Sequence, residues 1–82
     1  MSNPEKSAVV YSIPNCGFCM KVKHLLRTQD IKFSERVIGK DVTKEEAITE
    51  IGRNITTVPQ VVIDGEYVGS YSSTMKYLKI KD

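Results

Sequence analysis

Residues 15–23, NCGFCMKVK, lie where a strand-like run gives way to a helical pattern, and they carry both cysteines of the chain. The run before them, AVVYSI (8–13), is apolar and β-branched and has the length of a buried strand. From Cys16 to about Gln29, apolar residues recur at the spacing of a helix. The apolar residues expected to share the inward face of this helix are Phe18, Val22, Leu25 and Leu26.

The middle of the chain predicts a second strand and a second helix. Residues 31–38 (IKFSERVI) alternate with a period of two, which places Ile31, Phe33 and Glu35 on one face of a strand. Thr43 followed by Glu46 is a capping-box signature, and it predicts a helix that stops near Gly52. The residues expected to face inward from this helix are Ala47, Ile48 and Ile51.

The last third predicts a hairpin and a final helix. VPQVVID (58–64) and EYVG (66–69) read as strands joined by an Asp-Gly turn, and residues 70–80 read as a helix. The order is therefore β-α-β-α-β-β-α. Because a strand-helix-strand crossover gives parallel neighbours and a hairpin adds antiparallel ones, we expect an α/β fold with a four-stranded mixed sheet flanked by helices. Residues 1–7 are expected to form a flexible tail, and 8–82 a single domain.

Composition restricts the class of protein. The chain has 82 residues, 40% of them hydrophobic, and a net charge of +2 without a dense basic block. These values favour one small globular domain and argue against nucleic acid as the main partner. No apolar run approaches the ~18 residues of a membrane span, and the N-terminus lacks a signal-like apolar stretch. We therefore expect a cytoplasmic protein, in a compartment where a cysteine pair is normally kept reduced.

The cysteine pair has three interpretations. A structural zinc site needs four ligands, whereas this chain has two cysteines and one histidine, His24. Two buried thiols acting as small hydrophobes are the second possibility, but a position at a helix N-terminus argues against it. The third is a reactive dithiol. The free N–H groups and partial positive charge of the first turn lower the pKa of a thiol at Cys16, and Lys21 and Lys23 add positive charge nearby. Cys19, one turn later and more shielded, would then resolve the mixed disulfide that Cys16 forms.

Three stretches together resemble the glutaredoxins, small members of the thioredoxin-like superfamily. They are CGFCMKVK (16–23), with Lys23 at a position where the family usually has lysine; TVPQVVIDGEYVG (57–69); and GSYSS (69–73). The resemblance implies that Cys16 is the nucleophile, that Cys19 is the resolving thiol and that Lys23 tunes the pKa of the site. It also implies a cis peptide bond before Pro59 and a groove that binds glutathione. The groove residues implied are Thr57, Val58, Pro59, Tyr71, Ser72 and Ser73.

The chain departs from the family pattern at several positions. Ile13 stands where the family commonly has a cation that pairs with glutathione's glycine carboxylate, and Ser73 replaces an aspartate near the ligand's amino group. Ser70 replaces the second glycine of a Gly-Gly pair. Lys40 and Arg53 are candidates for the missing cation. These changes predict glutathione binding weakened several-fold, since an exposed ion pair contributes only about 0–1 kcal/mol.

The resemblance implies a glutathione-dependent thiol–disulfide oxidoreductase that reduces protein disulfides and glutathione mixed disulfides. One client it implies is ribonucleotide reductase, and we expect a monomer without a metal ion in its site. Two alternatives stay open. A thioredoxin reductase is the first alternative source of electrons, because Ile13 and Ser73 remove two charged contacts. An iron–sulfur cluster carrier assisted by glutathione is the second, because Cys16-Gly17-Phe18 also begins the motif of single-cysteine family members.

Overall fold

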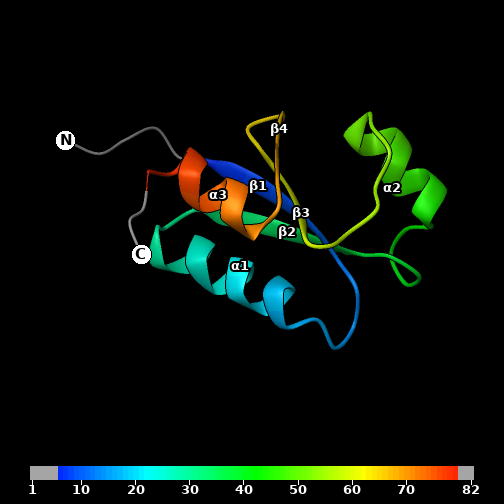
Figure 1. Cartoon of the computed structure of the whole chain (residues 1–82), viewed down its shortest axis with the longest axis horizontal. Coiled ribbons are helices and arrows are strands. Elements are labelled where there is room, and N and C mark those ends of the chain that lie inside the picture. The colour runs from blue at the N-terminus through cyan, green and yellow to red at the C-terminus, as the bar shows by residue number, and fades with distance from the viewer. Residues whose placement is uncertain (1–5, 80–82) are drawn as a thin grey trace.

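The computed structural model describes residues 6–79, which form a four-stranded mixed sheet with helices on both faces (Figure 1). The strands are β1 (Ser7–Ser12), β2 (Lys32–Val37), β3 (Gln60–Ile63) and β4 (Glu66–Gly69), and the helices are α1 (Gly17–Thr28), α2 (Lys44–Ile51) and α3 (Tyr71–Tyr77). The spatial order of the strands is β2-β1-β3-β4. β1 pairs in parallel with β2, while β3 is antiparallel to both β1 and β4. The predicted α/β element order and mixed sheet are confirmed.

Two apolar clusters hold the helices against the sheet. On one face, α1 and α3 pack over a cluster whose fully buried members are Val10, Val22, Leu26, Val61 and Ile63. On the other face, α2 and the loops beside it cover a second cluster, formed by Tyr11, Val42, Ala47 and Ile55. β1 and β3 are the inner strands of the sheet and contribute to both clusters, and α1 begins just beyond the end of β1.

The inward face of α1 differs from the predicted one at its first turn. Phe18 is 56% exposed, so its predicted burial is wrong. Cys19 occupies the inward position instead and is 2% exposed. The buried face of α1 therefore runs through residues 19, 22 and 26. Phe18 lies outside this face, and the centre of its ring is 6.0 Å from that of Tyr71.

Local signals set the ends of α2 and the turn of the hairpin. Thr43 and Glu46 form the predicted capping box, in which each side chain accepts a hydrogen bond from the other residue's backbone N–H. Gly52 ends α2 with φ at +87°, a left-handed conformation that glycine adopts without steric cost. The turn between β3 and β4 has positive φ at Asp64 and Gly65, as a tight hairpin turn requires.

Several element ends differ from the predicted ones by one to three residues, and three of these differences have a visible cause. β1 already begins at Ser7, because its backbone N–H donates to the Asp64 carboxylate and its C=O accepts from the Asp64 N–H. β3 begins only at Gln60, since Pro59 has no N–H to donate to the sheet. α3 ends at Tyr77, and Lys79 then takes a positive φ that a helix excludes. Residues 1–5 of the predicted tail and 80–82 lie outside the described residues.

The helices are short. The longest, α1, has 12 residues, and no helix within residues 6–79 is long and apolar enough to cross a membrane, which takes about 20 residues.

The capping box predicts a stability effect at Thr43. Thr43→Ala removes the oxygen that accepts from the Glu46 N–H, so we expect the free energy of unfolding to fall by about 1 kcal/mol. Thr43→Ser keeps that oxygen and should retain most of the stability. Urea unfolding followed by circular dichroism measures both variants, and equal stability of the alanine variant and the parent would contradict the assigned cap.

Candidate active site

Cys16 is the N-cap residue of α1, and a disulfide joins it to Cys19. The Cys16 Sγ accepts a hydrogen bond from the backbone N–H of Cys19, with 3.1 Å between nitrogen and sulfur. The first N–H groups of a helix have no intrahelical acceptor and carry partial positive charge. The N–H that meets the sulfur here is therefore placed to stabilise a Cys16 thiolate after reduction.

The two sulfurs differ in their access to solvent. Cys16 is partly exposed, whereas Cys19 is 2% exposed and lies on the buried side of α1. Attack on a disulfide from solution requires an accessible sulfur, and resolution of a mixed disulfide requires only that the second thiol reach the first. The burial of the two residues thus fits the predicted roles of Cys16 and Cys19.

A pocket of about 350 Å³, here called the dithiol pocket, opens beside the disulfide. Its wall is formed by residues 13–16, by the first two turns of α1, and by Glu35, Val37 and Lys40 at the end of β2 and just after it. Two large apolar side chains stand exposed at this pocket, Ile13 at 43% and Met20 at 66%. The surface that a substrate meets at the sulfurs is therefore apolar, and charged groups lie beside it.

Lys23, the predicted pKa-tuning residue, lies in the dithiol pocket but is paired with an acid. Its Nζ lies 2.8 Å from Oε2 of Glu35, and the same oxygen accepts a hydrogen bond of 2.6 Å from the hydroxyl of Ser12. These two donors, the ammonium first, hold the pKa of the Glu35 carboxyl below its usual value. The positive charge of Lys23 is consequently balanced by a carboxylate within the same pocket.

A second groove, of about 210 Å³, adjoins the dithiol pocket through Ile13. Thr57 and Val58 line it, and Pro59 follows Val58 through a cis peptide bond and is buried. Gln60 fixes this segment, because its side-chain amide donates to the Thr57 C=O at 2.8 Å. The structure thus places Thr57 and Val58 in a groove that shares Ile13 with the dithiol pocket, and the buried Pro59 follows them.

Gln60 is itself held by a residue of β4. The hydroxyl of Tyr67 donates to its Oε1 at 2.7 Å, and the guanidinium of Arg53 lies 4.1 Å from the centre of the Tyr67 ring. Arg53 therefore stacks on an aromatic ring, whereas Lys40, the other candidate cation, lines the dithiol pocket.

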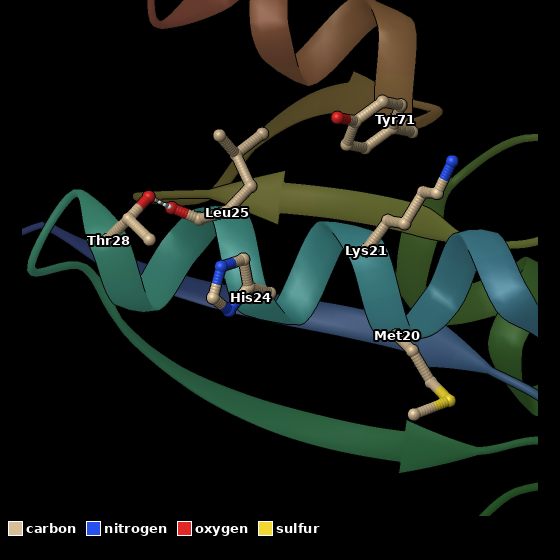
Figure 2. A pocket seen from close by; sticks show the side chains of 6 residues that line it. All are labelled: Met20, Lys21, His24, Leu25, Thr28 and Tyr71. Atoms are coloured by element: carbon tan, nitrogen blue, oxygen red, sulfur yellow. Dashed lines mark hydrogen bonds between the residues drawn. The ribbon is translucent and has the colours of Figure 1, made fainter.

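Tyr71 lies in a third groove, of about 530 Å³, between α1 and α3 (Figure 2). Figure 2 shows Lys21 and Leu25 extending from α1 toward the ring of Tyr71. Met20 lines both this groove and the dithiol pocket. Tyr71 thus lies in a different groove from the two sulfurs, and its predicted contact with substrate stays a prediction.

Ser72 and Ser73 lie at the start of α3, where Ser70 is the N-cap residue. The Ser73 N–H is 3.5 Å from the Ser70 hydroxyl oxygen, which accepts from it. Neither serine lines the three grooves described above. This arrangement fits helix capping, and the predicted contact with a ligand carboxylate stays a prediction.

Comparison with known proteins identifies the family. The family model for glutaredoxin matches residues 8–68, from β1 to β4. This chain belongs to the glutaredoxin family. The match ends just before GSYSS (69–73), the stretch in which Ser70 and Ser73 depart from the family pattern.

Curated relatives and solved structures agree with this assignment. Glutaredoxin 3 of Escherichia coli K12 is 38% identical over 61 residues, which cover 73% of this chain and 71% of that protein. The hybrid peroxiredoxin hyPrx5 of Haemophilus influenzae is 37% identical over 73 residues; these cover 89% of this chain but 30% of that longer protein.

Among solved structures, reduced E. coli glutaredoxin superposes with a TM-score of 0.74 at 25% identity, covering 89% of this chain and 93% of that one. The buckwheat glutaredoxin–glutathione complex gives 0.71 at 26% identity, covering 90% and 69%. The thioredoxin-like fold is confirmed. Together with the cysteine pair, family membership makes this chain a thiol–disulfide oxidoreductase, and glutaredoxins use glutathione as their reductant.

Met20 and Glu35 line the dithiol pocket, but neither of them is assigned a functional role from the sequence. A signal existed for Glu35, because the period of two in residues 31–38 places it on the same face as Ile31 and Phe33, which are buried and partly buried. An acid on the inward face of a strand usually has a partner. Met20 gave no such signal, since an exposed methionine in a helix has many explanations.

The described residues offer little to a metal ion. Within 6–79 no group of three or more His, Cys, Asp or Glu side chains is placed to hold one. An iron–sulfur cluster usually takes four thiolates, and this chain has two cysteines, with Cys19 buried. The chain by itself therefore does not fit a cluster, which would need thiol ligands from other molecules.

The pairing of Glu35 predicts a pH-dependent stability. Because the folded-state pKa of Glu35 is lowered, its ionised form stabilises the fold above the ordinary carboxyl pKa. This contribution is lost as the pH falls through the lowered value. We expect the parent to exceed Glu35→Gln in unfolding free energy near pH 7, and this difference to shrink between about pH 5 and 3.

Urea unfolding of the oxidised proteins measures this difference. Glu66→Gln, at an exposed site on β4, serves as the control for removal of one negative charge. A difference between parent and Glu35→Gln that stays constant from neutral to acidic pH would contradict the assigned ion pair.

Proposed function

We propose that this protein reduces protein disulfides and glutathione mixed disulfides, and that reduced glutathione regenerates its dithiol. The observation that carries the proposal is the contact between the Cys16 sulfur and the Cys19 N–H at an open pocket, with the Cys19 side chain buried behind it. Such a site combines one accessible, stabilised thiolate with one protected thiol.

The reaction transfers two electrons from the Cys16–Cys19 dithiol to the substrate disulfide. The Cys16 thiolate attacks one sulfur of the substrate disulfide, a bond forms between the two sulfurs, and the other substrate sulfur leaves as a thiolate that takes up a proton. The Cys19 thiol then loses its proton and attacks Cys16, which releases the second substrate thiol and closes the Cys16–Cys19 disulfide. Two glutathione molecules reduce this disulfide and become one molecule of glutathione disulfide.

The groove at Thr57 and Val58 is the proposed site for the glutathione backbone. An extended peptide can pair with exposed main-chain groups as an added strand does, and glutathione is a peptide with a central cysteine. Ile13 joins this groove to the dithiol pocket, so a peptide in the groove could place its sulfur near Cys16. The related buckwheat protein in complex with glutathione supports the assignment. Pro59, Tyr71, Ser72 and Ser73 complete the proposed site.

Lys40 is the proposed partner of glutathione's glycine carboxylate. Ile13 provides no cation, and Arg53 lies over the ring of Tyr67. Lys40 lines the dithiol pocket beside Ile13 and Cys16, which makes it the better placed of the two candidate cations. Since it is exposed, its contribution would be about 0–1 kcal/mol.

A thioredoxin reductase is the second candidate source of electrons. The observation that favours it is again Ile13, which replaces a charged contact with glutathione by an exposed apolar side chain. In either case the proposed setting is the cytoplasm, the proposed state is a monomer, and ribonucleotide reductase is one proposed client.

The roles of the two cysteines predict different losses on substitution. Cys16→Ser removes the attacking sulfur, so we expect at least a hundredfold loss of glutathione-coupled disulfide reduction. Cys19→Ser removes only the resolving thiol, and it should retain reduction of glutathione mixed disulfides while losing reduction of protein disulfides that need both thiols. A coupled assay with glutathione reductase measures both, and substantial activity of the Cys16 variant would overturn the proposal.

The proposed reductant predicts a kinetic preference. With a model protein disulfide as substrate, we expect turnover to be supported by glutathione at millimolar concentration and to exceed that supported by thioredoxin reductase with NADPH. The rates of the same purified protein with each reductant give the comparison. Faster turnover with thioredoxin reductase would contradict the preference for glutathione and would identify the reductase as the source of electrons.

A further inference from the structure

Three polar side chains are hydrogen-bonded at the dithiol pocket: Lys23 and Glu35 line it, and Ser12 is buried next to Glu35. The buried hydroxyl of Ser12, at the end of β1, donates to Glu35 Oε2 on β2, and Lys23 Nζ on α1 donates to the same oxygen. The side chains of Lys23 and Glu35 are only 20% and 33% exposed. The pair therefore joins α1 to β2 at the pocket that contains the sulfurs, and both side chains are partly shielded from solvent.

The balance of charge around this pocket depends on Glu35. Lys23 stands four residues after Cys19, on the same side of α1, and both line the pocket. Lys40 enters from the segment after β2, and Arg27 on α1 also acts on the Glu35 carboxylate. Among the described residues that line the pocket, Glu35 is the one acid.

We propose that Glu35 is a positioning residue that holds the Lys23 ammonium against β2 and offsets its charge, and so limits how strongly the site favours the Cys16 thiolate. The inference rests on the proposed function, because it concerns the thiolate that attacks the substrate. Glu35 itself accepts two hydrogen bonds through one oxygen and takes no proton in the reaction. Its effect reaches the sulfur through the charge that Lys23 presents.

Glu35 makes the dithiol less oxidising than it would be if the charge of Lys23 acted on Cys16 unopposed. A stabilised thiolate favours the reduced protein, so whatever weakens that stabilisation favours the disulfide. With Lys23 balanced by Glu35, the Cys16 thiolate relies mainly on the Cys19 N–H and on the remaining N–H groups of the first turn.

The test is the pH dependence of Cys16 alkylation by iodoacetamide in proteins that carry Cys19→Ser, where Cys16 is the single thiol. In this background, Glu35→Gln should lower the pH midpoint of the reaction by about half a unit, a threefold change in the ionisation constant. Lys23→Gln should raise the midpoint, because it leaves the carboxylate without its partner. The double variant replaces the ion pair by two neutral side chains and should lie near the parent.

The reduction potential gives an independent reading in the two-cysteine protein. Equilibration with glutathione buffers should show an equilibrium constant about threefold more favourable to the reduced form of Glu35→Gln, which corresponds to about 15 mV. Glu35→Asp keeps the charge and should stay near the parent. Glu50→Gln is the matched control, because Glu50 pairs with Arg36 of β2 from α2, on the other face of the sheet.

The outcomes separate the inference from the proposed function. An unchanged or raised midpoint in Glu35→Gln would overturn the inference, as would a double variant displaced as far as Glu35→Gln alone. A parent midpoint near that of an ordinary cysteine would instead contradict the proposed function. The difference between parent and variant would still be measured in that case, and it would decide the role of Glu35.

Discussion

The backbone N–H of Cys19 points at the sulfur of Cys16 because a helix begins between them. That geometry requires α1 to start at Gly17 and to stay fixed relative to the sheet. Val22 and Leu26, both fully buried against the sheet, provide the attachment. The apolar packing along α1 therefore keeps the N-terminus of the helix, with its unpaired N–H groups, in place just past the end of β1.

The surface around the sulfurs is assembled from segments far apart in the chain. Ile13 belongs both to the dithiol pocket and to the groove at Val58, and Met20 belongs both to the dithiol pocket and to the groove at Tyr71. Ile13 and Met20, both exposed and apolar, thus connect the dithiol pocket and the two grooves into one continuous surface. In the proposed reaction, a substrate would extend from the disulfide along either groove, so the proposed small-peptide and protein substrates would meet different parts of this surface.

The features that the sequence predicted correctly are those set by neighbouring residues. The capping box that begins at Thr43, the Asp-Gly turn and the helix that begins at Cys16 each depend on a few adjacent positions, and the structure contains all three. The rotation of α1 on the sheet was missed at Phe18, because apolar spacing allows either Phe18 or Cys19 to face inward. The pairing of Lys23 with Glu35 depends on how α1 lies over β2, and spacing within one segment does not encode that contact.

The position of β2 at the edge of the sheet has a consequence for solubility. An outer strand presents unpaired backbone groups to which a strand of another molecule can add, and charged side chains discourage such addition. β2 reads KFSERV, and half of its six residues are charged. The strand that supplies an acid to the dithiol pocket is thereby also protected against edge-to-edge aggregation with other copies of the chain.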